Sequence, residues 1–197
     1  IDRIAEQGTI FLNSYCNVPV CGASRASVMT SIRPITGKRY MSHMSRADEE
    51  APGVRTLVGH FKDNGYTTIS NGKVLHIKED SESDWSEKPW HDIEYSLKEW
   101  AKPTFDALWK LPESKNNLSK RGRGPYFEAA DVADNEHQDG KVADKTIADL
   151  QRLKNDGKPF FMACGFWRPH LPFNAPKKYF DMYDPNKLPL EQNRFPI

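Results

Sequence analysis

Long apolar runs are absent from this sequence of 197 residues. A membrane-spanning helix needs about 20 mainly apolar residues in a row, so the sequence predicts no membrane span. A net charge of either sign is nearly absent as well, because 28 lysines and arginines balance 27 aspartates and glutamates to a formal charge of +1. This balance argues against a general attraction to nucleic acid and still allows a local pocket for an anion.

Cysteine is scarce, with three residues in the whole sequence. Three cysteines cannot build a disulfide framework, and an odd number leaves at least one thiol unpaired. Cys164 ends the apolar run that starts at Phe160, which predicts a buried free thiol. An initial methionine is also lacking, so the absence of a signal peptide says nothing about export.

The rest of the composition is that of a globular segment, with 38% hydrophobic and 28% charged residues. Helix and strand patterns alternate along the chain, which predicts an α/β fold. Apolar residues recur at helical spacing ahead of stop signals at Asn64-Gly65 and Asp156-Gly157, and strand-like runs follow at 66–70 and 160–163. The second of these runs is apolar throughout, which predicts a buried central strand.

Residues 78–138 are less regular, and we predict that they form an insertion within the domain. Four of the five tryptophans lie there among many charged residues: Trp85, Trp90, Trp100 and Trp109. Aromatic side chains in such a segment can form a rim that contacts sugar rings, or they can anchor the insertion to the core. Anchoring is favoured, since tryptophan is usually largely buried.

The stretch Cys21-Gly22-Ala23-Ser24-Arg25 places a thiol, a permanent cation and small residues at the predicted start of a helix, which should run to the residue before Pro34. Helix-terminal N–H groups and a guanidinium both favour an anion. The motif therefore allows an activated thiolate. It equally allows a small buried cysteine ahead of a helix.

This stretch and the helix after it resemble the signature of the type I sulfatase family, in which Cys-x-Pro/Ala-Ser-Arg precedes Leu-Thr-Gly-x-x-Pro. The sequence reads Cys-Gly-Ala-Ser-Arg at 21–25 and Met-Thr-Ser-Ile-Arg-Pro at 29–34. Two further stretches resemble the same family, in particular its iduronate-2-sulfatase-like branch: Asn-Gly-Tyr-Thr-Thr-Ile-Ser-Asn-Gly-Lys-Val-Leu-His at 64–76 and Pro-Phe-Phe-Met-Ala-Cys-Gly-Phe-Trp-Arg-Pro-His-Leu-Pro-Phe at 159–173. Three motifs in the family's order are hard to obtain by chance.

The resemblance implies an alkaline-phosphatase/sulfatase-like α/β sandwich, with a central, mostly parallel sheet flanked by helices. It also implies hydrolysis of O-sulfate esters of a sulfated carbohydrate, such as a glycosaminoglycan or another polysaccharide unit, with a 2-O-sulfated uronate as one candidate. In this family a maturase oxidises the motif cysteine, here Cys21, to formylglycine, whose hydrate is a geminal diol. One hydroxyl attacks the sulfur and the other then expels sulfate, so that covalent catalysis is split into two easier steps.

The same resemblance assigns roles to individual residues, because a sulfuryl group in transfer carries negative charge that fixed cations must stabilise. Arg25 would hold the formylglycine hydroxyl and the metal environment. Lys73 and His170 would contact the sulfate, and His76 the second hydroxyl of the diol. A Ca²⁺ ion would polarise the ester, with Cys21 as formylglycine among its ligands.

Each of these residues also has an ordinary structural interpretation, as a solvated turn lysine, a strand-end histidine or a surface loop histidine. Trp167 lies three residues before His170 in the same predicted loop. The sequence leaves open whether Trp167 faces the substrate or packs inside the protein.

The sequence departs from the family pattern at two positions of the first motif. Ala23 replaces a frequent proline, which leaves open which maturase acts, and Ser31 replaces a glycine that allows close helix packing. The family's Asp-Asp pair on the first strand and a later Asp with Asn or His are not found, so the other metal ligands are expected outside this chain. Residues 1–197 are therefore predicted to be a partial N-terminal catalytic domain without its first strand and C-terminal part, inactive alone.

Members of this family encounter their glycans in a periplasm, a lysosome or the extracellular space. By analogy, the resemblance implies that this protein is exported. Two other functions stay open. A non-catalytic binder of sulfated glycans would keep Cys21 as a thiol. A phosphohydrolase of the alkaline-phosphatase superfamily would use an unconverted nucleophile, and the intact maturation signal argues against it.

Overall fold

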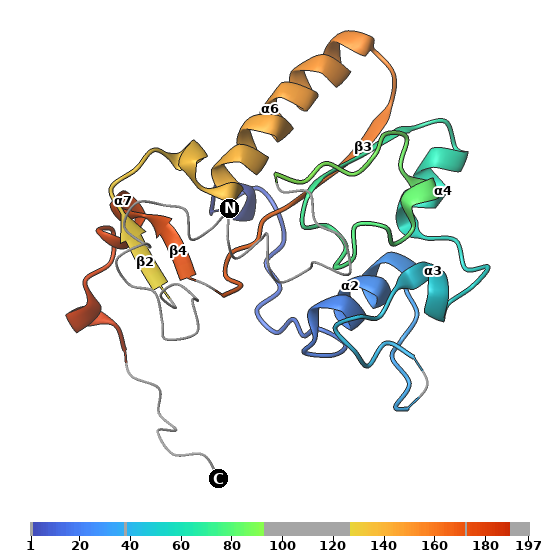
Figure 1. Ribbon diagram of the computed structural model, residues 1–197, viewed down its shortest axis with the longest axis horizontal. Helices are drawn as coiled ribbons and strands as arrows, with labels where there is room; N and C mark the ends of the chain where they lie inside the picture. Colours follow the sequence, from blue (N-terminus) through green and yellow to red (C-terminus); the bar gives the residue numbers. More distant parts are fainter. Residues whose placement is uncertain (1, 38, 93–126, 172, 190–197) are drawn as a thin grey trace, which may run out of the picture. The chain divides into compact units, whose positions relative to one another are not determined.

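The computed structural model describes residues 2–37, 39–92, 127–171 and 173–189. The chain divides into two compact units (Figure 1). The first comprises residues 1–65 and 75–86, and the second comprises residues 66–74 and 87–197. No helix in the described ranges is both long enough and apolar enough to cross a membrane.

Short helices make up the first unit. They are α1 (Asp2–Ala5), α2 (Cys21–Thr30), α3 (Ala47–Glu50), α4 (Leu57–Asp63) and the 3₁₀ turn η1 (Glu82–Asp84). Small side chains on α2 let it pack closely, since Ala23 and Ala26 are fully buried in a cluster with Tyr40. This cluster is the apolar core behind the start of α2.

The helix α2 begins at Cys21 as predicted, but it ends at Thr30 rather than next to Pro34. Ser31 adopts a left-handed conformation with φ of 58°, which stops the helix. The hydroxyl of Ser27 then donates to the carbonyl oxygen of Ile32 at 2.7 Å. Glycine tolerates the left-handed conformation best, which explains why the family pattern has glycine where this chain has Ser31.

The predicted helix before Asn64-Gly65 is confirmed as α4, which starts at Leu57. The side chain of Thr56 caps it by accepting from the N–H of Gly59 at 3.0 Å. Thr56 also donates to the buried carboxylate of Asp84. Arg55 pairs with Asp84 at 2.5 Å, so this carboxylate ties the start of α4 to η1.

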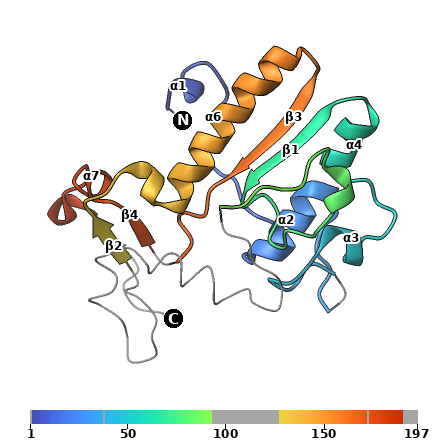
Figure 2. The ribbon, with the colours of Figure 1, turned by 45° about the horizontal axis from the view of Figure 1, so that its top comes forward.

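The second unit holds one long helix and two pairs of parallel strands. Its elements are β1 (Thr67–Gly72), β2 (Phe127–Ala130), the 3₁₀ turn η3 (Asp134–Glu136), α6 (Gln138–Asp156), β3 (Phe160–Gly165), β4 (Phe173–Pro176), α7 (Lys177–Phe180) and the 3₁₀ turn η4 (Pro185–Lys187). Strand β1 pairs with β3 and β2 pairs with β4, both in parallel. The helix α6 runs alongside β1 and β3 and contacts both strands (Figure 2).

Buried polar contacts fix α6 against β1. Asn71, which is fully buried, donates from Nδ2 to Asp149 Oδ2 at 2.9 Å. Lys145 lies one turn earlier on the helix and pairs with the same carboxylate at 2.5 Å. The helix ends as predicted at Gly157, whose φ is 66°. Because a removed partner would leave a buried charge uncompensated, this contact specifies how the helix lies on the strand.

The strand β3 is confirmed, but its predicted burial is wrong. Five of its six residues are partly exposed, and Cys164 is exposed rather than buried. Strand β3 pairs with β1 along one edge, and within the described residues no strand pairs along the other. The apolar sequence of β3 therefore marks a strand that is only half covered here.

The predicted insertion at 78–138 falls largely on residues 93–126, which lie outside the described residues together with Trp100 and Trp109. Trp85 is buried in the first unit. The main chain of Trp90 forms a parallel bridge to β1, donating to Ser70 O at 2.9 Å and accepting from Gly72 N at 2.8 Å. Both Trp85 and Trp90 thus attach this segment to the protein.

The carboxyl ends of β1 and β3 approach each other so closely that both require glycine. Gly72 lies opposite Gly165 in the register. A Cβ atom on Gly72 would lie 2.2 Å from the carbonyl oxygen of Gly165, and one on Gly165 would lie 2.0 Å from that of Lys73. Neither backbone oxygen can move away without breaking the strand pair.

Replacing Gly72 by alanine should lower the free energy of unfolding by about 2–4 kcal/mol, because it adds a steric clash to a left-handed backbone. The matched control is Gly157→Ala, which has a similar φ of 66° and no heavy atom within 4 Å of the added Cβ. The control should lose only about 1 kcal/mol. Urea unfolding of both variants measures the difference, and equal losses would show that the strand ends are not in close contact.

Candidate functional site

Cys21 opens α2 and lies against a buried histidine within the first unit. Its Sγ atom is 3.3 Å from Nδ1 of His76, which is 3% exposed. The ring of His43 meets that of His76 edge-on, with centroids 6.1 Å apart. The structure thus brings together two residues that stand 55 positions apart in the sequence. A group on the Cys21 side chain can exchange a proton directly with the imidazole.

Arg25 lies one turn after Cys21 on the same helix and is partly buried. Burial lowers the pKa of Arg25 from its ordinary value, and the charge that Cys21 can carry raises it part of the way back. Guanidinium groups stay protonated even so. Arg25 is therefore a permanent cation that interacts electrostatically with a negative charge at Cys21.

The main chain around residue 43 packs directly on the first turn of α2. A Cβ atom on Gly22 would lie 2.1 Å from the carbonyl oxygen of His43. The N–H of Ala23 donates to the carbonyl oxygen of Ser42 at 3.1 Å. Proline has no N–H, so the proline that many family members have at this position would lose this bond. Alanine thus suits the local packing of this chain.

Lys73 lies at the carboxyl end of β1, within the second unit. Its N–H donates to Gly165 O at 2.7 Å, which keeps it next to the end of β3. The side chain is 2% exposed, and Nζ lies 4.4 Å from the centroid of the Trp167 ring. An ammonium over an indole face is attracted by the ring quadrupole. Trp167, which is 7% exposed, therefore packs inside the unit with its face toward Lys73.

His170 lies in the loop between β3 and β4 and is exposed. Its ring meets that of Trp167 edge-on at 6.2 Å. Nδ1 of His170 lies 2.6 Å from the carbonyl oxygen of Leu171, and because a carbonyl oxygen only accepts, Nδ1 carries the hydrogen. Nε2 is then the nitrogen that accepts a proton in the neutral ring or donates one in the imidazolium.

The six predicted site residues thus form two groups. Cys21, Arg25 and His76 gather in the first unit, while Lys73, Trp167 and His170 gather in the second. Parallel strands bring their carboxyl ends to one edge of a sheet, where ligands of α/β proteins bind. The second group has this location.

The loop after β3 depends on two charged residues for which the sequence predicts no role. Asp139, in the first turn of α6, accepts from the main-chain N–H groups of Trp167 and Arg168. Arg168 donates from Nε to Asn174 O at 2.8 Å and from Nη1 to His170 O at 3.2 Å. Burial lowers the pKa of Arg168 from its ordinary value, with the charge of Asp139 acting the other way.

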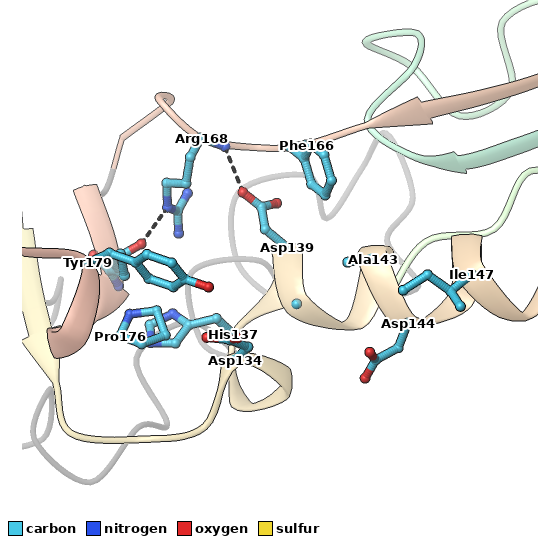
Figure 3. A pocket seen from close by; sticks show the side chains of 13 residues that line it. Asp134, His137, Asp139, Ala143, Asp144, Ile147, Phe166, Arg168, Pro176 and Tyr179 are labelled. Carbon is cyan, nitrogen blue, oxygen red and sulfur yellow. Dashed lines mark hydrogen bonds between the residues drawn. The ribbon is translucent and has the colours of Figure 1, made fainter. Parts of the chain in front are cut away.

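A cavity of about 510 Å³ borders this loop and is lined by residues from the start of α6, β4 and α7 (Figure 3). Its lining includes Asp134, Asp139, Asp144 and Arg168. Carboxylates outnumber the arginine, which does not suit a sulfate anion. Lys73, Trp167 and His170 are not part of its lining. The cavity is therefore separate from the candidate site.

Metal ligands do not come together in the part of the chain that the structure describes. Among those residues, no group of three or more His, Cys, Asp or Glu side chains is arranged so that it could hold a metal ion. The described residues alone do not fit the calcium ion that the resemblance implies. Calcium binding stays a prediction from the resemblance.

Known proteins similar to this chain include several members of one family. A sequence model described as Sulfatase matches residues 1–194. The chain is 30% identical to human iduronate 2-sulfatase over 93% of its own length and 32% of that protein. It is 30% identical to a sulfatase of Formosa agariphila, over 99% of this chain and 38% of that protein. An ulvan-active sulfatase of the same organism is 29% identical, over 100% of this chain and 35% of its own length.

The chain belongs to the sulfatase family. The predicted resemblance is thereby confirmed, and so is the alkaline-phosphatase-like α/β fold class, of which parallel strands flanked by helices form a part. The chain spans about a third of the length of the relatives named above.

Proposed function

We propose that the protein is a sulfuric ester hydrolase and that this chain supplies part of its catalytic domain. The observation that carries the proposal is the contact between Cys21 and His76 at the start of α2, with Sγ 3.3 Å from Nδ1, in a chain that belongs to the sulfatase family. A thiol held there is available for oxidation to formylglycine by a maturase. Converted in this way, the Cys21 side chain would supply a hydrated aldehyde. One hydroxyl attacks sulfur as the alcohol leaves with its oxygen, and the other then expels sulfate and restores the aldehyde.

His76 and Arg25 serve that position in different ways. The imidazole of His76 lies within proton-transfer distance of the side chain at position 21, so it can take up or return a hydroxyl proton. The half-buried guanidinium of Arg25 is one turn away and remains charged throughout. It stabilises negative charge on the attacking oxygen.

Lys73 and His170 provide positive charge for the sulfate oxygens. The ammonium of Lys73 is buried, which strengthens its interaction with an anion relative to water. His170 presents Nε2 as the donor once the ring is protonated. Trp167 is 7% exposed, so we propose that it acts on the substrate chiefly by holding Lys73 rather than by stacking on a sugar.

The proposed substrate is an O-sulfate ester of a carbohydrate, with a 2-O-sulfated uronate as the first candidate. The second and third motifs are most similar to the iduronate-2-sulfatase-like branch. Relatives named for iduronate and for ulvan are 30% and 29% identical to this chain, so identity alone does not choose between them. Calcium, a formylglycine-generating maturase and export to a periplasm, lysosome or extracellular space belong to the same proposal.

Turnover of matched esters tests the function. The complete protein that carries this chain should hydrolyse 4-nitrophenyl sulfate with a kcat/KM at least about 10²-fold above that for 4-nitrophenyl phosphate. The two esters share a leaving group, so the comparison isolates the transferred group. Faster phosphate hydrolysis would favour the phosphohydrolase. Binding of a sulfated glycan with no turnover of either ester would favour the non-catalytic binder.

A further inference from the structure

We propose that Asp139 is a positioning residue, whose carboxylate holds the loop after β3 in the conformation that places Trp167 against Lys73 and His170. The proposal rests on the function proposed above, because its purpose is to hold the groups that receive the sulfate. Asp139 lies on α6, and its carboxylate accepts from two main-chain N–H groups of the loop, so it acts through the main chain.

The carboxylate of Asp139 accepts from two consecutive peptide groups, one on each oxygen. Oδ1 accepts from the N–H of Trp167 at 2.7 Å, and Oδ2 accepts from the N–H of Arg168 at 3.0 Å. Figure 3 shows the carboxylate turned toward the main chain at Arg168. Hydrogen bonds to an ionised carboxylate are shorter and about twice as strong as neutral ones. Two of them at successive residues fix both position and direction of the chain.

The helix that carries this carboxylate, α6, is held in place by several contacts. Asp139 is the second residue of α6, a helix of 19 residues that Asn71 and Asp149 tie to β1. Gly140 presses against η3, where an added Cβ would lie 1.9 Å from the carbonyl oxygen of Asp134. The start of α6 therefore cannot shift freely, and the loop must adapt to the helix rather than the reverse.

The clamped segment is the one that carries the chemistry. Trp167 N–H is held by Asp139, and the carbonyl oxygen of the same residue accepts from His170 N–H at 2.8 Å. The Trp167 ring lies 4.4 Å from Lys73 Nζ and 6.2 Å from the His170 ring, measured from its centroid. A shift of the Trp167 main chain would therefore move the contacts to both cationic groups at once.

Amide exchange gives a test that does not require activity. In the complete protein, Asp139→Asn and Asp139→Ala should raise the hydrogen-exchange rates of the Trp167 and Arg168 amides at least about tenfold, because each amide loses a charged acceptor. The matched control is Asp144→Asn, which removes the same charge from an exposed position on α6. The control should leave both amides unchanged. The asparagine variant preserves shape and guards against a folding failure of the alanine variant.

Kinetics on 4-nitrophenyl sulfate then test whether the hydrogen bonds of Asp139 to the loop, called the clamp below, serve the reaction. Both Asp139 variants should lower kcat by about 10–100-fold, the range expected from an ångström-scale misplacement. Combining Asp139→Ala with Trp167→Phe should lower kcat by less than the product of the two separate fold-losses, since both act on one contact.

Unchanged exchange at the two amides, or a kcat within twofold of the Asp144→Asn control, would overturn the proposal. A wild-type protein without sulfate turnover would refute the function alone, and exchange would still decide whether the clamp exists.

Discussion

Replacing Cys21 by alanine should lower kcat for sulfate-ester hydrolysis by at least about 10⁴-fold, because loss of a covalent nucleophile leaves only binding and electrostatic contributions. The substitution is small, and the partly exposed Cys21 lies at the helix start, so the protein should stay folded. Lys73 and His170, which the proposal assigns to the sulfate oxygens, are unchanged. The expected variant therefore binds substrate with little change in affinity but does not turn it over.

Cys16→Ala is the matched control, since Cys16 is an exposed free cysteine of the same unit. It should keep wild-type activity. Mass spectrometry of the Cys21 peptide from protein purified from its native host should show formylglycine or its hydrate. An unmodified thiol in an active preparation, or full activity of Cys21→Ala, would refute the proposed nucleophile.

Replacing Lys73 by methionine should lower kcat/KM for 4-nitrophenyl sulfate by about 10²–10³-fold, the cost of removing one fixed donor from a site where charge develops. Methionine keeps an unbranched side chain of similar length, so it can still pack on the Trp167 ring. The loss then reports the missing ammonium rather than a cavity. Steady-state kinetics together with circular dichroism separate the two causes.

Lys158→Met provides the comparison for this variant. Lys158 is exposed and lies just before β3 in the same unit, so its replacement removes an equal charge away from the candidate site. The kinetics of this control should match those of wild type. A Lys73→Met variant that stays folded and lies within threefold of this control would show that Lys73 does not contact the sulfate.

Local signals were enough to predict β1, β3 and the long helix α6, whereas β2 and β4 were not predicted. The end of α6 follows from Asp156-Gly157, because glycine accepts the left-handed conformation that stops a helix. The end of α2 was mispredicted because proline is a strong signal, whereas Ser31 gives no comparable sign of its left-handed conformation. Cys164 was mispredicted because an apolar strand reads as buried whether or not both of its edges are covered.

Tertiary contacts account for what the sequence left open at the site. Asp139 reads as an ordinary acidic residue in the first turn of a helix, where the helix dipole favours it. Nothing near it in the sequence indicates that it accepts from two amides 28 and 29 positions later. Trp167 could have faced the substrate or the interior, and only its contact with Lys73 distinguishes these outcomes. The two alternatives differ in packing, which a local pattern does not encode.

The helix α6 also fixes the spacing between two contacts within the second unit. Asp139 in its first turn accepts a hydrogen bond from the loop after β3, and Asp149 further along accepts one from Asn71 on β1. Each residue added to a helix rotates the downstream residues by about 100° around the axis and advances them by about 1.5 Å. A single-residue insertion between the two aspartates would therefore turn one of them away from its partner. The spacing of these aspartates is thus constrained whatever residues occupy the exposed positions between them, and a length change there would act like a mutation in the site itself.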